Sequence, residues 1–307
     1  MFYSTERNII SVSRRTDIPA FYSDWFFRRL DAGFVTVRNP YNPLLTRRVS
    51  LRRDNTDGFV FWTKNPAPML ERTDELHKKC LCFYFHFTIN GYGRDIEPNL
   101  PDIDERIETF RELAFKLGRS KKPDKVIWRY DPILINEKHS AEWHVDTFGK
   151  IAARLEGSTS VAVVSFIDTS YPKVYRRTSD LLLHRITPEM KIAVMKRLNH
   201  IASAHDIRIA ACAEMVDLSA CGISKAHCIS DRIFSNYCIF GEPDPNDEVN
   251  VEGIFDTPLK EKDKNQRPLC GCISGVDIGA YNTCRHGCIY CYASSDDDNA
   301  APDTLTD

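Results

Sequence analysis

The sequence predicts an α/β fold, a TIM-like (β/α) barrel, and three observations lead to that prediction. Short runs rich in β-branched and aromatic residues recur along the 307-residue chain. Amphipathic stretches with a helical period separate most of these runs. No Gly/Ser-rich linker or internal repeat divides the chain. Because strands that alternate with helices form a parallel sheet, and this many units favour closure, we expect one barrel domain over residues 1–293.

The expected elements follow one another in a regular order. Strands are predicted at residues 9–13, 34–37, 58–63, 82–89, 125–130, 160–166, 208–213 and 275–281. Helices are predicted at residues 20–32, 66–79, 103–117, 142–155 and 187–204. The helix over 103–117 shows the typical packing stripe, formed by Ile103, Ile107, Phe110, Leu113, Ala114 and Leu117.

The strand over residues 82–89 separates two kinds of side chain by its period of two. One face is apolar and suits the helix layer, with Phe83, Phe85, Phe87 and Ile89. The other face suits the barrel interior, with Tyr84, His86, Thr88 and Asn90. For His86 two interpretations stay open, an interior histidine satisfied by its neighbours or a functional group.

The last third of the chain differs from the rest. A charged, turn-rich segment over residues 241–267 predicts a long excursion before the last strand. Nine of the eleven cysteines follow residue 210, so residues from about 205 to 293 form a cysteine-rich part. Residues 294–307 are acidic and lack an apolar face, which predicts a disordered tail.

Composition excludes some classes of protein. The formal net charge is −2, so no global basic field favours nucleic acid or an anionic membrane surface. The first residues lack a basic region followed by an apolar one, and no apolar run approaches the length of a membrane span. We therefore expect a cytoplasmic protein with no membrane partner, in which cysteines are thiols or metal ligands rather than a disulfide framework.

Three thiols within eight residues form the strongest motif. The stretch CRHGCIYC contains Cys284, Cys288 and Cys291 on what must be one short loop. A tetrahedral zinc takes four ligands and needs further residues from elsewhere. A 4Fe-4S cluster also usually takes four thiolates, so three leave one iron open for a small molecule. Incidental structural thiols are the third alternative.

Other cysteines suggest a second centre. Cys270 and Cys272 precede the last strand, Cys212 ends the strand before it, and Cys228 lies in the following loop. Four thiolates suit an auxiliary Fe-S cluster or a closed zinc site, with Cys221 as a substitute ligand. Buried free thiols, which behave as small hydrophobes, are the structural alternative.

Polar residues follow several of the expected strands and should meet at one rim of the barrel. They are Ser13 to Asp17, Thr63 to Asn65, Thr88 to Asn90, Arg129 to Asp131, Asp168, Cys212 to Glu214 and Asn282 to Cys291.

These motifs together resemble a known superfamily. CRHGCIYCYA is similar to the Cys-x3-Cys-x2-Cys motif of radical S-adenosylmethionine enzymes, with Tyr290 before the third cysteine. FWTKNPAPML, FHFTIN, Glu97-Pro98, DERIETFRELA and WRYDPI resemble consecutive blocks of the spore photoproduct lyase-like branch. The chain is also similar to an uncharacterised bacterial domain family with a cysteine-rich C-terminus.

The resemblance implies an enzyme with two cofactors. Cys284, Cys288 and Cys291 would hold a 4Fe-4S cluster, whose open iron would take S-adenosylmethionine and yield a 5'-deoxyadenosyl radical that abstracts hydrogen from an unknown substrate. Tyr290, Thr88, Asn90, Arg129 and Arg15 would contact S-adenosylmethionine, although ion pairs with Asp17 or Asp131 are the alternative for both arginines. A reductant such as flavodoxin or ferredoxin is an implied partner.

The order of the elements departs from that superfamily. There the cysteine loop follows the first barrel strand, whereas here it follows the last expected one. A closed barrel permits this circular permutation because its first and last strands are neighbours. Two other function classes remain: a non-catalytic zinc or Fe-S protein that binds a partner or nucleic acid through the cysteines, and an electron-transfer module. Scattered basic pairs make nucleic acid a weak candidate substrate.

Overall fold

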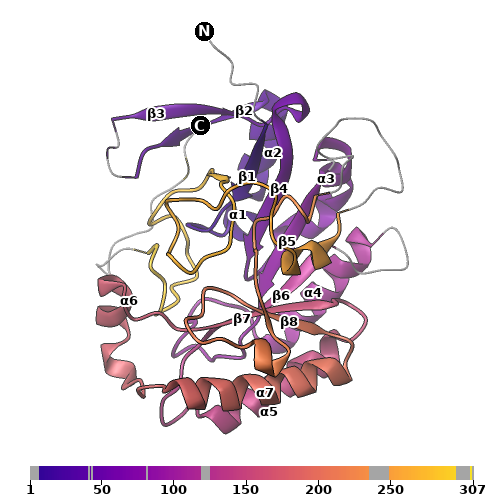
Figure 1. Ribbon diagram of the computed structural model, residues 1–307. Coiled ribbons are helices and arrows are strands. Elements are labelled where there is room, and N and C mark those ends of the chain that lie inside the picture. Colours follow the sequence, from indigo (N-terminus) through magenta and orange to yellow (C-terminus); the bar gives the residue numbers. More distant parts are fainter. Residues whose placement is uncertain are drawn as a thin grey trace.

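Eight strands form one sheet in the computed structural model, which describes residues 7–40, 42, 44–80, 82–118, 125–234, 249–294 and 305 (Figure 1). All neighbouring strands are parallel, in the order β10-β1-β4-β5-β6-β7-β8-β9. The strands are β1 (Asn8–Val12), β4 (Thr56–Thr63), β5 (Phe83–Thr88), β6 (Val126–Ile133), β7 (Val161–Phe166), β8 (Arg208–Ala211), β9 (Ser224–Lys225) and β10 (Val276–Asp277). This mixed α/β architecture confirms the predicted TIM-like fold class.

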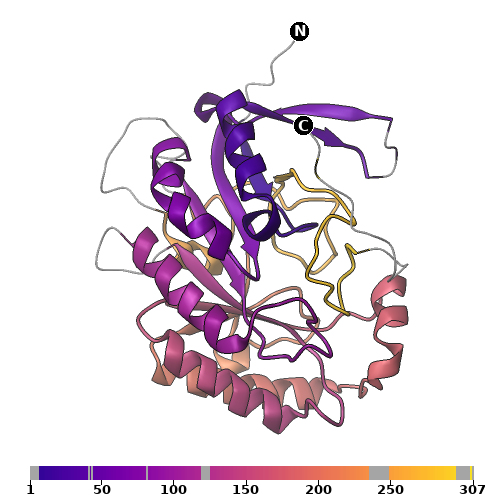
Figure 2. The ribbon, with the colours of Figure 1, turned by 180° about the vertical axis from the view of Figure 1, so that it is seen from behind.

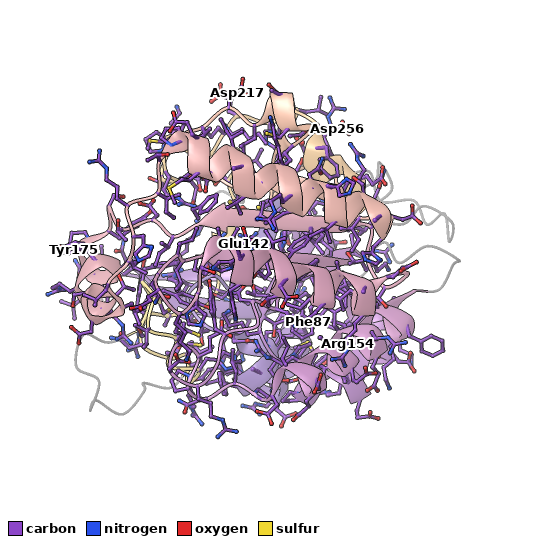
Figure 3. All side chains as sticks on the ribbon, turned by 90° about the horizontal axis from the view of Figure 1, so that it is seen from below. Phe87, Glu142, Arg154, Tyr175, Asp217 and Asp256 are labelled. Atoms are coloured by element: carbon purple, nitrogen blue, oxygen red, sulfur yellow. The ribbon has the colours of Figure 1, made fainter. Side chains whose placement is uncertain are left out.

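Helices cover the outer face of the sheet, as Figure 2 shows from behind. The α-helices are α1 (Ile18–Phe21), α2 (Ser23–Ala32), α3 (Thr73–Lys79), α4 (Ile103–Leu117), α5 (Ala141–Leu155), α6 (Pro172–Arg177) and α7 (Pro188–Ala204). Short 3-10 helices are η1 (Arg53–Asn55), η2 (Ala67–Arg72), η3 (Ser179–Leu181), η4 (Ser219–Cys221) and η5 (Val251–Phe255). Helices α5 and α7 lie side by side (Figure 3).

The two faces of the sheet belong to different apolar clusters. The outer cluster includes Phe83, Phe85 and Phe87 of β5, and the Phe87 ring stacks on Phe110 of α4 at 5.2 Å. Tyr84, on the opposite face of β5, belongs to the inner cluster. The predicted alternation along this strand is therefore confirmed.

The inner face is covered by chain from the last third of the sequence. Residues from 226–234, 249–254 and 270–273 pack onto β4, β5, β6, β7 and β8. The described part of the expected excursion therefore fills the concave side of the sheet. The final yellow segment in Figure 1 lies beside this filling, between α6 and the hairpin formed by β2 (Phe34–Arg38) and β3 (Thr46–Ser50).

The prediction that residues 34–37 form a barrel strand is wrong. They lie in β2 (Phe34–Arg38), which pairs antiparallel with β3 (Thr46–Ser50) in a separate two-stranded sheet. The Pro- and Asn-rich segment between them turns the chain back, and the Asn39 amide donates to the Leu45 carbonyl at 2.8 Å. A hairpin therefore stands where we expected one strand of a barrel.

The last expected strand is much shorter than predicted. Only Val276 and Asp277 of residues 275–281 form β10, which pairs parallel with β1 through Ile10 opposite Val276. Strand β9 and helix α6 were not predicted. Strand β10, the last in chain order, therefore lies next to β1, the first in chain order.

Two further expectations fall largely outside the described residues. Of the predicted acidic tail, only residues 294 and 305 are described, and Cys238 is not described. Among the parts of the chain that the structure describes, no helix combines the length and apolar character needed to cross a bilayer.

Candidate metal centre and its surroundings

Residues 284–291, the cysteine loop, lie at the carboxyl edge of the parallel sheet. The Ile289 amide donates to the Ile96 carbonyl at 3.0 Å, and the Asn99 amide donates to the His286 carbonyl at 3.2 Å. The Tyr22 hydroxyl donates to the Thr283 carbonyl at 2.9 Å. These bonds connect the loop to the chain after β5 and to the helices after β1, so several strands fix its position.

Gly287 lets the loop approach the chain that follows β5. Its φ is +70°, in the left-handed region that glycine adopts without strain. A Cβ atom there would lie 3.1 Å from Cγ of Pro98 and 3.2 Å from Nδ2 of Asn99. Glycine at position 287, directly before Cys288, therefore fits both the left-handed backbone conformation and the limited space.

The three thiols of the loop are free. Cys288 is buried, whereas Cys284 and Cys291 are half-buried. Burial raises the pKa of Cys288 well above its usual value, with Lys64 acting in the opposite direction. Burial, with Cys291 and Asp17 nearby, raises the pKa of Cys284 to about 12. A positive centre such as a metal would be needed to convert the thiols of Cys284 and Cys288 to thiolates at neutral pH.

A buried ionic network contacts the cysteine loop through Tyr290. The Lys64 ammonium donates to Glu97 at 2.8 Å and to the Tyr290 hydroxyl at 2.8 Å. The Arg106 guanidinium donates to the other oxygen of Glu97 at 3.1 Å. The Tyr290 hydroxyl also donates to Glu97, and Asn90 reaches the Tyr290 oxygen at 3.2 Å. We call Lys64, Glu97, Arg106 and Tyr290 the Glu97 network.

Glu97 and Lys64 stay ionised although they are buried. Burial opposes the charge of Glu97, but Lys64 and Arg106 outweigh it and hold the pKa of the carboxyl below its usual value. Burial likewise opposes the charge of Lys64, but Glu97 and Cys288 raise the pKa of the ammonium. Two cations and one carboxylate leave a net positive charge next to Cys288.

A second polar contact holds the loop from the side of β1. Nε2 of His286 lies 2.7 Å from Oδ2 of Asp17. The same carboxylate accepts from the backbone amides of Lys64 at 2.7 Å and Ala20 at 3.0 Å. Asp17 therefore joins the chain after β1, the chain after β4 and the cysteine loop.

The structure also brings together the four cysteines predicted for a second centre. We call Cys212, Cys228, Cys270 and Cys272 the inner cysteine cluster. All four lie in the inner apolar cluster, and electrostatic interactions link Cys212 with Cys228, Cys228 with Cys272, and Cys272 with Cys270. The contact with Cys228, together with Arg129, lowers the pKa of Cys212 to about 7 despite burial.

The other cysteines lie apart from both groups. Cys221 packs at the outer apolar cluster and is therefore no part of the inner cysteine cluster. Cys80 is a buried free thiol, and Cys82 is disulfide-bonded. The expectation of thiols thus holds for nine of the ten described cysteines, and Cys82 is the exception.

The residues predicted to contact S-adenosylmethionine make protein contacts of their own. Asn90 accepts from the Asp131 amide at 2.8 Å and donates to its carbonyl at 3.0 Å. Arg129 pairs with Asp131 and lies 3.3 Å from Sγ of Cys228. Arg15 pairs with Asp277 at 3.2 Å, not with Asp17 or Asp131.

Thr88 and His86 lie on the inner face of β5. Thr88 is buried opposite Arg129 of β6. His86 stacks on Trp62 at 4.3 Å, and its Nε2 lies 2.9 Å from the Cys228 carbonyl. Burial, with Arg129 acting in the same direction, lowers the pKa of His86 to about 3. His86 is therefore a neutral interior histidine.

Sequence reasoning did not assign Lys64, Glu97, Arg106, Asp17 or His286 to the site. Lys64 was noted as a polar residue after a strand and within the resembling block FWTKNPAPML, Asp17 as a polar residue after a strand and a possible ion-pair partner of the arginines, and Glu97 only as part of a resembling block. Arg106 was noted only within the resembling block DERIETFRELA, because it is otherwise a charged residue on an ordinary amphipathic helix. A lysine directly after a buried strand was the clearest available signal.

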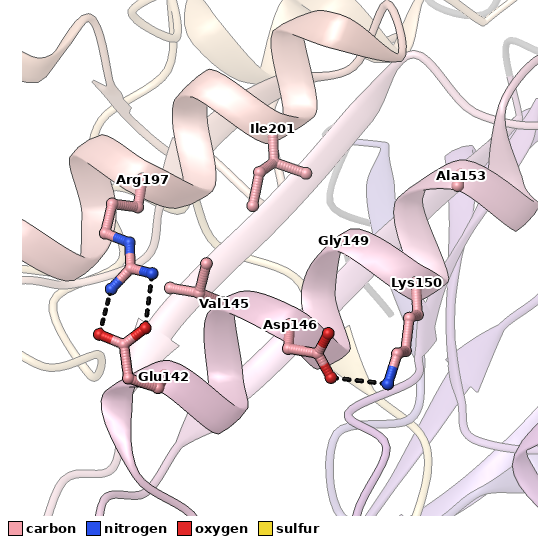
Figure 4. Close-up of a pocket in the computed structure, with 8 residues that line it drawn as sticks. All are labelled: Glu142, Val145, Asp146, Gly149, Lys150, Ala153, Arg197 and Ile201. Carbon is pink, nitrogen blue, oxygen red and sulfur yellow. Dashed lines mark hydrogen bonds and ion pairs between the residues drawn. The ribbon is translucent and has the colours of Figure 1, made fainter.

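Among the described residues, no three or more His, Cys, Asp or Glu side chains are already arranged around one metal ion. A pocket lies elsewhere, on the outer surface between α5 and α7, where ion pairs such as Glu142–Arg197 and Asp146–Lys150 line it (Figure 4). The residues that line it come from α5 and α7 and include none of the predicted site residues, so the cysteine loop rather than this pocket is the candidate site.

Comparisons with known proteins give a family but no activity. The model of a family described as Domain of unknown function (DUF1848) matches residues 9–293. No curated protein matches the chain.

Two solved structures show weak similarity. A D-hydantoinase from a Bacillus species is 12% identical over 52% of this chain and 34% of its own, with a TM-score of 0.27. The pneumococcal virulence factor StrH is 11% identical over 93% of this chain and 81% of its own, with a TM-score of 0.31. This chain thus spans about a third of the hydantoinase, and neither likeness carries an argument about function.

Proposed function

The chain belongs to the DUF1848 family, and we propose that it is a radical S-adenosylmethionine enzyme. One observation supports this proposal most: three free thiols share an ordered loop at the carboxyl edge of a parallel sheet. In barrel folds this edge carries the catalytic groups. Three thiols from one loop match a cluster that keeps one iron open to a ligand.

The residues present fit such a cluster. Cys284, Cys288 and Cys291 would hold it, and the net positive charge of the Glu97 network would offset the charge of the thiolates. Burial favours the protonated thiol of Cys288, whereas the positive charge of Lys64 and a bound metal would both favour its thiolate. When bound and reduced, the cluster supplies the electron that cleaves S-adenosylmethionine and so produces the 5'-deoxyadenosyl radical.

The residues around the loop would position it. Lys64 fixes the Tyr290 hydroxyl, Asn90 contacts the same oxygen, and Gly287 permits close packing on Pro98. Contacts of Tyr290, Thr88, Asn90, Arg129 and Arg15 with S-adenosylmethionine stay predictions.

Two finer statements also belong to this proposal. The pairing of β10 with β1 supports a circularly permuted relative of the spore photoproduct lyase-like branch, since it places the cysteine loop next to the first strand. A flavodoxin or ferredoxin would supply electrons in the cytoplasm.

Electron paramagnetic resonance of anaerobically purified, dithionite-reduced protein tests the proposal. We expect a 4Fe-4S signal that changes when S-adenosylmethionine is added, and loss of this ligand-sensitive signal in Cys288→Ala. Cys221→Ala is the matched control, because that thiol lies outside both groups, and it should leave the signal unchanged. Iron-free protein with zinc at the cysteine loop after reconstitution would favour the non-catalytic alternative and end this proposal.

A further inference from the structure

The inner cysteine cluster is assembled from three separate segments. Cys212 follows β8, Cys228 follows β9, and Cys270 and Cys272 lie before β10. All four are buried, with exposed fractions of 8, 1, 5 and 2% respectively. All four pack in the same inner apolar cluster, and electrostatic interactions link Cys228 with Cys212 and with Cys272. Residues up to 60 positions apart in sequence therefore place their sulfur atoms together inside the fold.

From this arrangement we propose that Cys212, Cys228, Cys270 and Cys272 form a second thiolate-bound metal centre. None of these ligands belongs to the cysteine loop, so the inference does not rest on the proposed function. Four thiolates are the ligand set of both closed zinc sites and Fe-S clusters.

The backbone around these cysteines is fixed closely enough to carry ligands. Gly271 separates Cys270 from Cys272, and a Cβ on it would lie 2.6 Å from Nδ1 of His227. That nitrogen lies 2.8 Å from the Gly271 carbonyl. The short segment is thereby held against the residue next to Cys228. Contacts of this kind, one step beyond the ligands, orient metal sites.

The carbonyl of Cys228 is held from the sheet as well. The Tyr84 hydroxyl donates to it at 2.9 Å, and Nε2 of His86 lies 2.9 Å away. Because a carbonyl oxygen can only accept, Nε2 of His86 carries the proton and donates this bond. Two neighbouring side chains of β5 therefore fix the position of this ligand.

Positive charge accompanies the four sulfur atoms. Nη1 of Arg129 lies 3.3 Å from Sγ of Cys228. Arg14, whose guanidinium lies over the Trp62 ring at 4.8 Å, interacts electrostatically with Cys272 and Cys270. Four thiolates on a doubly charged metal or cluster carry a net charge of about −2. Arg129 is also paired with Asp131, so the two guanidinium groups offset only part of that charge, whereas four neutral thiols would need no cation near them.

Metal analysis of the full-length protein, purified anaerobically, tests the inference. The contents of zinc, iron and acid-labile sulfide per chain are measured for the wild type and three variants. The variants are C270S/C272S, C284S/C288S/C291S and the control C221S. We expect the triple variant to keep about one zinc, or about four irons with sulfide. The double variant should lose that metal, and C221S should match the wild type. The zinc and iron outcomes distinguish a mononuclear site from a cluster.

Folding defects are separated from ligand loss by a second measurement. Metal-stripped C284S/C288S/C291S is titrated with Co²⁺, and thiolate-to-cobalt absorption should appear. The same titration of a variant that also carries the C228S substitution should show no such absorption. The inference is overturned if the triple variant binds neither native metal nor Co²⁺. It is also overturned if C270S/C272S keeps the wild-type metal content, or if mass spectrometry of the native protein shows disulfides among these four cysteines. Because the triple variant lacks the cysteine loop's ligands, failure of the proposed function leaves this test intact.

Discussion

Replacing Glu97 by Gln removes the one carboxylate of the Glu97 network. Glu97 is 1% exposed and accepts from Lys64 at 2.8 Å, from Arg106 at 3.1 Å and from the Tyr290 hydroxyl. The amide keeps one acceptor oxygen but cancels the charge. Two cations then remain in the interior with no carboxylate between them.

The expected loss of stability follows from that geometry. Breaking a buried ion pair by removing one partner costs about 3–5 kcal/mol. Since the Lys64 side chain keeps 17% exposure and Gln retains an acceptor, we expect the lower end, about 3 kcal/mol. With an unfolding entropy of about 0.6 kcal/mol per degree for a chain of this length, the melting temperature should fall by about 5 °C.

Urea denaturation at pH 7 measures the free energy of unfolding. The matched control is Glu108→Gln, because Glu108 also pairs with two arginines, Arg111 at 3.3 Å and Arg154 at 3.2 Å, but is 59% exposed. Exposed pairs contribute about 0.5 kcal/mol. Equal losses in the two variants would refute the argument that burial makes the Glu97 network important.

The pH dependence gives the same test a second readout. The pKa of Glu97 is lower in the folded chain than its usual value, so its contribution is complete above about pH 4.3, the usual glutamate value. It should disappear as the pH falls through the lowered pKa. The stability difference between wild type and Glu97→Gln should therefore be flat from pH 6 to 8 and shrink only in acid. A difference that shrinks between pH 6 and 8 would contradict this assignment.

Three further substitutions or titrations follow from single contacts. Gly287→Ala should lower the free energy of unfolding in urea by about 1–3 kcal/mol. The loss should exceed that of the control Gly157→Ala, because Gly157 has a similar φ of +72° but nothing within 4 Å of an added Cβ. Equal losses would exclude crowding at the cysteine loop. The NMR shifts of His86 should stay constant from pH 5 to 8 because its pKa is lowered to about 3, and a midpoint in that range would contradict its burial. Gly58→Ala places a Cβ 2.2 Å from the Phe234 ring and should cost about 1–3 kcal/mol, and unchanged stability would show that the ring moves freely.

Local patterns predicted most helices and strands, because apolar periodicity depends only on nearby residues. The helix over residues 103–117 has the predicted bounds, since its stripe and its flanking Pro101 and Gly118 are visible in the sequence. Residues 34–37 were assigned to the wrong sheet because strand propensity does not reveal the pairing partner. Likewise, β10 has two residues because the glycines at 275 and 279 limit it.

The site was predictable where residue type alone carries the chemistry. The four thiols of the inner cysteine cluster were predicted as a group, and the structure places them in one buried cluster. The Glu97 network was not predicted, because Lys64, Glu97 and Tyr290 meet only through tertiary structure, 33 and 193 positions apart. Charged residues have many solvated roles, so their sequence positions cannot indicate which of them will be buried together.

The pairing of β1 with β10 also affects the order of events during synthesis. Ser11 donates to Asp277 across 266 positions of sequence, so this edge of β1 has no partner until the ribosome has made nearly the whole chain. At about 5–20 residues per second that delay is roughly 15–50 s. During it, β1 presents an open strand edge of the kind that aggregates. Nascent chains halted before residue 270 should therefore depend more on chaperones than finished ones, and the cysteine loop takes its place only at the end.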